Sequence, residues 1–411
     1  MLARNFENAV TDRLLLFPSV SETYRLMVVV GEPSGDAHAA ALVRALRSTA
    51  PQIDFEFFGA TGPLMRKEEI ETIVNSDSLA IMGIVEVGRV FPRFLRAFRE
   101  LKDAATVRKP DTVILVDWPE FNLRLAAALH RRGFKVIYYI SPQLWAWRSR
   151  RIETIKRHVD LLLAILPFEV EWYKARGVDH IEFVGHPLSG EVHARYGREE
   201  FCRTHDLDSA KPMVALLPGS RHKELVRILP PMLDAIDLLM RERPNIQPII
   251  VVAPSRHRDE VTNILSQRQS NTALTIVEHG TREALAAADV AAIASGTATL
   301  EAALLGTPMV IVYKESSINW HTLGRLITVD HYGLVNLIAG QRLVTELMQD
   351  DLTGERLCKE IVGLLDPDQN QKMRSQLHEI KNKLGESEAS ERAAGSILAF
   401  LRSASRSPNS N

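Results

Sequence analysis

Short, continuous apolar runs recur along this chain, and a loop of small residues and a helical pattern follow most of them. The first run is Leu26–Val30, which a loop at 31–36 and a helical stretch to Leu46 follow. Further strand-length runs lie at 55–58, 112–116, 136–139, 161–166, 181–184, 214–217, 248–252, 274–277, 290–293 and 309–312. Strands that are apolar throughout are typical of a parallel sheet covered on both faces. The pattern predicts an α/β fold with two doubly wound, Rossmann-like domains whose parallel sheets face a central cleft.

The length of 411 residues also favours two domains. We expect a disordered extension at 1–22, a first domain at 23–200 and a second at 201–350. Helices without a further strand follow at 351–402, and spacing alone does not establish whether they pack back on the first domain. The stretch 196–211 is polar, charged and without an apolar period, so it is the predicted linker.

Composition excludes several classes of protein. The net charge is −1, so no overall basic field indicates a nucleic-acid partner. Cys202 and Cys358 are far apart, which predicts neither a disulfide framework nor a metal site. No apolar run reaches the roughly 18 residues that span a bilayer. We therefore expect a cytoplasmic protein.

Two loops in the second half of the chain are suited to an anion. The loops 216–221 and 294–301 each join a strand to a helix, where backbone N–H groups and the positive end of the helix dipole attract negative charge. Arg221 adds a guanidinium, and Glu301, one turn into its helix, suits a pair of sugar hydroxyls. Ordinary strand-to-helix turns also use such residues, but together the loops predict a pocket for a nucleotide diphosphate. Its other candidate residues are Gly219, Ser220, Ser295, Gly296 and Thr297.

The first half offers two more loops at strand ends. The loop 31–36, with Ser34 and Gly35, lacks the glycine spacing of dinucleotide folds and the Gly-Lys-Ser/Thr ending of P-loops. That disfavours a dehydrogenase or an ATPase and leaves a phosphorylated substrate or a plain turn. Asp117 ends the run 112–116, where a carboxylate can act as a general base or cap the next helix.

The stretch 141–148 also follows a predicted strand. Gln143, Trp145 and Trp147 could hold a sugar or anchor a domain edge, and for Trp147 packing is favoured. His186 precedes a proline in a loop, where a structural role is favoured over a catalytic one.

An amphipathic, basic pattern covers 81–98. Phe91, Phe94, Leu95 and Phe98 fall at i, i+3, i+4 and i+7, and Arg93 and Arg96 lie elsewhere around the helix. Such a helix suits an anionic membrane surface. A core helix with solvated arginines fits the same spacing.

Eight motifs in order resemble the lipid-A-disaccharide synthase family, over about residues 25–384. They are Gly-Glu-Pro-Ser-Gly-Asp (31–36), Met-Gly-Ile-Val-Glu-Val (82–87), Asp-Trp-Pro-Glu-Phe-Asn (117–122), Ser-Pro-Gln-Leu-Trp-Ala-Trp (141–147), Val-Gly-His-Pro-Leu (184–188), Leu-Leu-Pro-Gly-Ser-Arg (216–221), Ser-Gly-Thr-Ala-Thr-Leu-Glu (295–301) and Asn-Leu-Ile-Ala-Gly (336–340). The chain departs from the family at Val335 and Thr345, where proline is usual.

The resemblance implies an inverting GT-B glycosyltransferase that is peripheral to the cytoplasmic face of a Gram-negative inner membrane. It would join UDP-2,3-diacylglucosamine to 2,3-diacylglucosamine 1-phosphate (lipid X) by a β(1→6) bond and release UDP, without metal or cofactor. It also implies that Asp117 is the base or an acceptor-site carboxylate, that Arg221 holds the diphosphate and Glu301 the ribose, and that Asn336 lines the donor site. A homodimer is compatible with the resemblance, which leaves the oligomeric state open.

Two other interpretations remain from the residues. A UDP-sugar 2-epimerase shares the two-domain fold, but it needs no interfacial helix at 81–98. The other is a non-catalytic lipid- or sugar-nucleotide-binding protein built on a retired enzyme, and the intact Asp117, Arg221 and Glu301 argue against it.

Overall fold

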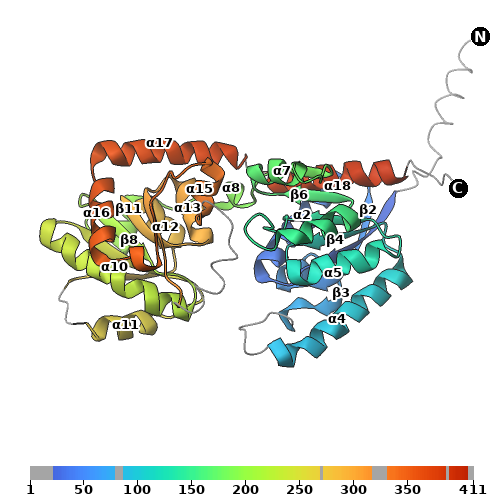
Figure 1. Cartoon of the computed structure of the whole chain (residues 1–411), viewed down its shortest axis with the longest axis horizontal. Coiled ribbons are helices and arrows are strands. Elements are labelled where there is room, and N and C mark those ends of the chain that lie inside the picture. Colours follow the sequence, from blue (N-terminus) through green and yellow to red (C-terminus); the bar gives the residue numbers. More distant parts are fainter. Residues whose placement is uncertain (1–21, 79–86, 269–271, 317–330, 386–387, 406–411) are drawn as a thin grey trace, which may run out of the picture. The chain divides into compact units, whose positions relative to one another are not determined.

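A computed structural model describes residues 22–78, 87–268, 272–316, 331–385 and 388–405 (Figure 1). The chain forms two compact units. One comprises 1–139, 158–160 and 394–411, and the other comprises 140–157 and 161–393. Residues 1–21 of the predicted extension lie outside the described residues, and so do residues 82–86 of the motif 82–87.

The first sheet has seven strands in the order β3-β2-β1-β4-β5-β6-β7. They are β1 (Thr23–Val29), β2 (Asp54–Thr61), β3 (Glu71–Asn75), β4 (Thr112–Val116), β5 (Val136–Tyr139), β6 (Leu161–Ala164) and β7 (Ile181–Phe183). β1 pairs in parallel with both β2 and β4. The chain therefore builds outward in one direction from β1 and in the other from β4. The loops after these two strands flank the switch point, where ligands bind in such sheets.

The second sheet repeats this topology with six strands in the order β10-β9-β8-β11-β12-β13. They are β8 (Met213–Leu217), β9 (Gln247–Val252), β10 (Thr275–Glu278), β11 (Val290–Ala294), β12 (Met309–Tyr313) and β13 (Glu346–Met348). β8 pairs in parallel with β9 and β11, so its switch point lies between β8 and β11. The predicted loops 216–221 and 294–301 follow these two strands.

Helices connect the strands throughout. They are α2 (Pro33–Thr49), α3 (Pro63–Lys67), α4 (Val87–Arg108), α5 (Pro119–His130), α6 (Ile152–His158), α7 (Pro167–Lys174), α8 (Leu188–Glu191), α9 (Arg198–Thr204), α10 (His222–Glu242), α11 (Arg258–Ser266), α12 (Thr281–Ala287), α13 (Thr297–Leu305), α15 (Leu334–Ala339), α16 (Gly354–Leu364), α17 (Pro367–Lys383) and α18 (Ala389–Ser405). Short 3₁₀ turns lie at Ser76–Ser78, Ser149–Arg151 and Gln349–Asp351.

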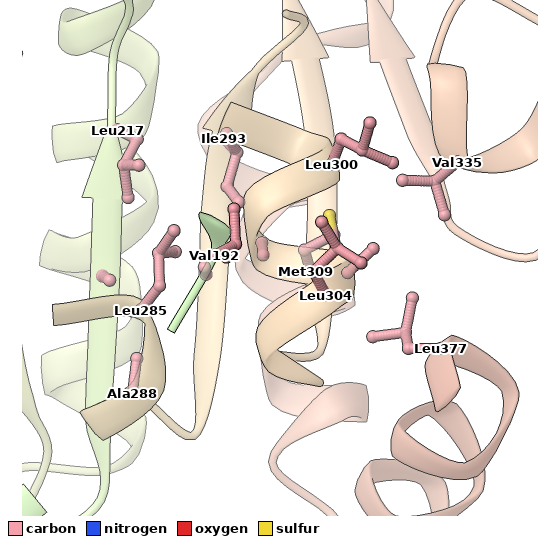
Figure 2. Close-up of a cluster of buried hydrophobic side chains, with 14 of the residues drawn as sticks. Val192, Leu217, Leu285, Ala288, Ile293, Leu300, Leu304, Met309, Val335 and Leu377 are labelled. Atoms are coloured by element: carbon pink, nitrogen blue, oxygen red, sulfur yellow. The ribbon is translucent and has the colours of Figure 1, made fainter. Parts of the chain in front are cut away.

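Two apolar clusters cover the opposite faces of the second sheet. Along β8, Ala215 and Leu217 belong to one cluster and Val214 and Leu216 to the other, because successive side chains of a strand alternate between faces. The first cluster packs β11 against α13, and α13 against α15 and α17 (Figure 2). The second packs the sheet against α10 and α16. Burial on both faces explains why these strands are apolar throughout.

The predicted α/β architecture with two parallel sheets is confirmed. The predicted linker at 196–211 is wrong in part, because α9 lies within it. Phe201 and Cys202 of α9 are buried in the first cluster, with Ala284 and Leu285 of α12. No helix in the described ranges is both long and apolar enough to cross a membrane.

Candidate functional site

A cavity of about 750 Å³ opens at the carboxyl ends of β8, β9, β10 and β11. We call it the β8–β11 cavity. Its lining residues all come from 193–301, within the second unit. The structure brings seven predicted residues together there, namely Gly219, Ser220, Arg221, Ser295, Gly296, Thr297 and Glu301. The two predicted anion loops therefore border one cavity.

The start of α13 offers unused hydrogen-bond donors to this cavity. Thr299 folds back on Gly296, since its N–H and its Oγ1 donate to the Gly296 carbonyl at 3.1 and 2.7 Å. The N–H groups of Gly296, Thr297 and Ala298 find no acceptor among the described residues. Free N–H groups at a helix start favour a bound anion. The predicted anion site therefore has its donors at α13.

The loop after β8 differs, because a carboxylate already occupies its donors. Glu224 Oε2 accepts from the N–H groups of Ser220 and Arg221 at 3.0 and 3.2 Å, and Oε1 accepts from Arg221 Nη1 at 2.8 Å. The Arg221 side chain is nevertheless 79% exposed. Its guanidinium is available to a ligand that replaces one bond to Glu224.

Three arginines line the cavity, and each is paired with a glutamate. Besides Arg221–Glu224, Arg195 Nε donates to Glu283 Oε1 at 2.8 Å and Arg282 Nε donates to Glu301 Oε1 at 3.0 Å. Arg282 also donates to the Glu191 carbonyl at 2.6 Å. Held by both bonds, Arg282 fixes the Oε1 atom of Glu301, the carboxylate that we expect to bind a ribose.

Six ionisable residues of this lining were not predicted from the sequence. They are His193, Arg195, Glu224, His279, Arg282 and Glu283. Arg282 was open to prediction, because it follows β10 and a glycine at the start of α12, as Arg221 follows β8. His193 and Arg195 follow no strand directly, so the strand-to-helix pattern does not single them out.

Asn336 is not among the described residues that line the β8–β11 cavity. It is fully buried, and its Nδ2 donates to the Val344 carbonyl and to Glu346 Oε1, both at 2.8 Å. Its Oδ1 accepts from the N–H groups of Leu343 and Val344. All its hydrogen-bonding positions serve the turn between α15 and β13, so none is left for a ligand.

Asp117 sits in the first unit, on a sharply bent backbone at the end of β4. Asp117 and Trp118 have φ of 50° and 51°, a left-handed conformation that costs non-glycine residues about 1–2 kcal/mol each. The Asp117 carbonyl accepts from Asn122 Nδ2 at 2.8 Å and from Tyr138 Oη at 2.6 Å. These two buried side chains hold the bend and fix the start of the Asp117 side chain.

Burial raises the pKa of the Asp117 carboxyl to about 6, and the nearby Glu32 charge adds to this shift. A hydrogen bond from the Trp118 N–H acts in the opposite direction. A carboxylate with this pKa is ionised at neutral pH and is a stronger proton acceptor than an ordinary aspartate. Asp117 is therefore suited to general-base chemistry.

The loop 31–36 adjoins Asp117 across the β1–β4 switch point. Ser34 is exposed and Gly35 is buried in the first turn of α2, where a Cβ at Gly35 would lie 3.7 Å from the Val116 carbonyl. A Cβ at Gly31 would meet the Trp118 ring at 2.0 Å, so only glycine allows the ring to lie there. Asp36 accepts from the N–H groups of Gly62, Leu64 and Met65, which is a structural role.

Glu169 fixes the stretch 141–148, which follows β5, by hydrogen bonds. This fully buried carboxylate accepts from Ser141 Oγ at 2.7 Å and from Trp145 Nε1 at 2.9 Å, and burial raises its pKa to about 7. Gln143 is exposed in the same stretch. The expectation that Trp147 packs is wrong, because Trp147 is 43% exposed and carries Arg148 over its ring.

His186 is buried and its Nδ1 accepts from the Leu188 N–H, which fits a structural role.

The predicted membrane face of α4 is divided. Phe94 lies 5.7 Å from Trp118 between ring centroids, and Phe98 lies 5.8 Å from Phe121. Leu95 is 41% exposed, and the arginines Arg93 and Arg96 are exposed. The side chain of Phe91 lies outside the described residues. Two of the four apolar residues therefore pack on α5 next to Asp117.

The sequence of this chain matches one family of known proteins. The family model described as lipid-A-disaccharide synthetase matches residues 26–399. The lipid-A-disaccharide synthase of Geobacter sulfurreducens is 41% identical over 380 residues, which cover 92% of this chain and 98% of the relative. That of Solibacter usitatus is 42% identical over 379 residues, with 92% and 97% covered.

Solved structures show the same fold at much lower identity. A putative UDP-N-acetylglucosamine 2-epimerase from Listeria monocytogenes has a TM-score of 0.62 at 14% identity, with 93% of this chain and 97% of that chain covered. The sucrose-phosphate synthase of Thermosynechococcus elongatus has a TM-score of 0.58 at 16% identity, with 93% and 100% covered. The epimerase likeness concerns the fold alone, whereas the synthases match in sequence over nearly their whole length. The chain belongs to the lipid-A-disaccharide synthase family and is a glycosyltransferase that forms the lipid A disaccharide.

Proposed function

We propose that this chain transfers the sugar of UDP-2,3-diacylglucosamine to the 6-hydroxyl of 2,3-diacylglucosamine 1-phosphate, with inversion and without a metal. The products are the β(1→6)-linked disaccharide 1-phosphate and UDP. The observation that carries this proposal is the β8–β11 cavity, where free N–H groups, Arg221 and Glu301 line one space at a switch point. A nucleotide diphosphate-sugar needs these groups.

The donor binds in this cavity. The α13 N–H groups of Gly296, Thr297 and Ala298 bind the diphosphate, Arg221 turns from Glu224 to join them, and Glu301 accepts hydrogen bonds from the ribose hydroxyls. As the bond from C1 to the diphosphate breaks, negative charge grows on the leaving UDP. Preorganised donors of this kind lower such barriers by about 3–4 kcal/mol each.

Asp117 is the general base. The acceptor O6 attacks the donor C1 on the face opposite UDP, so one displacement forms the new bond, breaks the old one and inverts the configuration. Asp117 takes the O6 proton as the nucleophile attacks. Ser34, Gly35 and Gln143 are further substrate-contact candidates, from the loop beside Asp117 and from the exposed stretch after β5.

Comparing Asp117→Ala with Arg221→Ala separates these roles. Asp117→Ala should lower kcat by about 100- to 10,000-fold and leave the Kd for UDP within twofold, because no described residue of the first unit lines the cavity. Arg221→Ala should weaken UDP binding about tenfold or more. If UDP binding collapses in Asp117→Ala, then Asp117 is structural and the assignment is wrong.

We also propose that the exposed part of α4 contacts the anionic cytoplasmic face of the inner membrane. Leu95, Arg93 and Arg96 form this contact, with Phe91 as a further candidate. Phe94 and Phe98 are better viewed as the packing face of the same helix, since both lie against α5.

Vesicle binding tests the membrane contact. The triple variant Arg93→Gln, Leu95→Ser, Arg96→Gln should bind vesicles of phosphatidylglycerol and phosphatidylethanolamine at least tenfold more weakly, at about 1 kcal/mol for each cation lost. Val107→Ser is the control, because Val107 is 80% exposed near the other end of α4. Equal partitioning of the triple variant and the unmodified protein would remove this contact from the proposal.

A further inference from the structure

Glu224 occupies donors that resemble a phosphate site. Its carboxylate accepts two adjacent loop N–H groups, from Ser220 and Arg221, and the Arg221 guanidinium, all within 3.2 Å. The carboxylate lines the β8–β11 cavity with its donors. An acid that takes two backbone N–H groups and one guanidinium imitates a bound phosphate oxygen pair.

Gly219 is what allows this arrangement. Its φ is +117°, and a Cβ there would lie 2.6 Å from Glu224 Oε2. Any other residue would push the carboxylate off its donors. The glycine therefore admits a glutamate of the chain itself, in addition to any ligand of the cavity.

The two helix starts in the cavity differ in whether a carboxylate of the chain already binds their N–H groups. At α13 the N–H groups of Gly296, Thr297 and Ala298 are without an acceptor in the described residues, whereas at α10 the N–H groups of Ser220 and Arg221 are neutralised from within. Diphosphate oxygens that approach α10 meet a negative charge and compete with it for Arg221.

We infer that Glu224 is a built-in anion that competes with the ligand's phosphates for Arg221 and the loop N–H groups, and so weakens the binding of UDP. The inference rests on the proposed function, which puts UDP in this cavity. Its consequence is that the donor is directed to the α13 donors and the product is released more readily. A role confined to capping α10 would not distinguish charged from neutral ligands.

Binding of UDP and of uridine to Glu224→Gln tests this inference by calorimetry. Glutamine also closes a capping box, so the variant removes the charge and retains the helix start. UDP should bind about five- to tenfold more tightly to Glu224→Gln than to the unmodified protein, and uridine should bind within twofold of its original Kd. Glu242→Gln, an exposed change at the end of the same helix, should change neither value.

Equal UDP affinity, or parallel changes for UDP and uridine, would overturn the inference and leave Glu224 as a cap. If Glu224→Gln does not fold, Glu224→Ala also removes the competing carboxylate, and tighter UDP binding is expected there too. An unmodified protein that binds no UDP contradicts the donor cavity itself. Measurable but unchanged UDP binding contradicts only the role of Glu224.

Discussion

The carboxyl group of Asp117 is held where its ionised form is costly. Its pKa rises from 3.8 in an unfolded chain to about 6 in the folded protein, mainly through burial. Because the folded-state pKa is the higher one, ionisation between about pH 4 and pH 6 lowers the free energy of unfolding. The stability that the protonated form provides is fully present below about pH 4 and is lost above about pH 6.

Asp117→Asn should therefore lose activity and gain stability at neutral pH. At pH 8 its free energy of unfolding should exceed that of the unmodified protein by about 1–3 kcal/mol, and near pH 4 the difference should disappear. Urea denaturation at both pH values measures this. Asp103→Asn on the exposed side of α4 is the control for the Asp-to-Asn change itself. A variant that is equally destabilised at both pH values would contradict the pKa argument.

For a single residue, the sequence predicts its place relative to a strand better than it predicts its hydrogen-bond partners. Asp117, Arg221 and Glu301 could be selected because they follow buried strands. Asn336 also lies in a helix near a strand. Its hydrogen-bond partners lie seven to ten residues further along the chain, in a turn that no local sequence pattern predicts. Trp145 and Trp147 are two residues apart, and only Glu169, 24 residues after Trp145, decides which one is buried.

Among the elements, buried strands and amphipathic helices were predictable, and two of the four edge strands were not. The central strands are apolar throughout because helices cover both faces. β3 and β13 lie at the edges of their sheets and were missed. β3 has one buried residue in five, and β13 has three residues in all, so neither presents an apolar run. The buried face of α9 consists of only Phe201 and Cys202, so the stretch 196–211 shows no apolar period.

The turn between α15 and β13 should depend on Asn336 for stability alone. Asn336→Ala leaves the Leu343 and Val344 N–H groups and the Glu346 carboxylate without this partner in a buried setting, which costs about 2–4 kcal/mol. Urea denaturation should show this loss in the free energy of unfolding. The folded variant should bind UDP with a Kd within twofold of that of the unmodified protein. Asn263→Ala, on the exposed side of α11, serves as the control. Intact stability with UDP binding weakened more than tenfold would return Asn336 to the donor site.

α4 has a packing face and an exposed face. Phe94 and Phe98 contact the aromatic pair Trp118 and Phe121, whose rings stack at 4.2 Å between centroids beside Asp117. Leu95 and the arginines remain exposed. The i, i+3, i+4, i+7 spacing could not separate these faces, because a packing face and a membrane face have the same period.

For the molecule as a whole, the repeated strand–loop–helix pattern was sufficient to predict two parallel sheets. The eight motifs were sufficient to predict the family, which the full-length relatives at about 40% identity confirm. The domain boundaries at 200 and 350, the membrane contact and the homodimer stay predictions. They depend on contacts between distant surfaces, which periodicity does not encode.

One measurement tests the central claim most directly. Purified protein is given UDP-2,3-diacylglucosamine and 2,3-diacylglucosamine 1-phosphate in the presence of EDTA, and both UDP and the disaccharide are quantified. The account predicts the two products in equal amounts, formed about 100- to 10,000-fold more slowly by Asp117→Ala at comparable protein levels. UDP without disaccharide, or activity that EDTA abolishes, would contradict a metal-independent transferase.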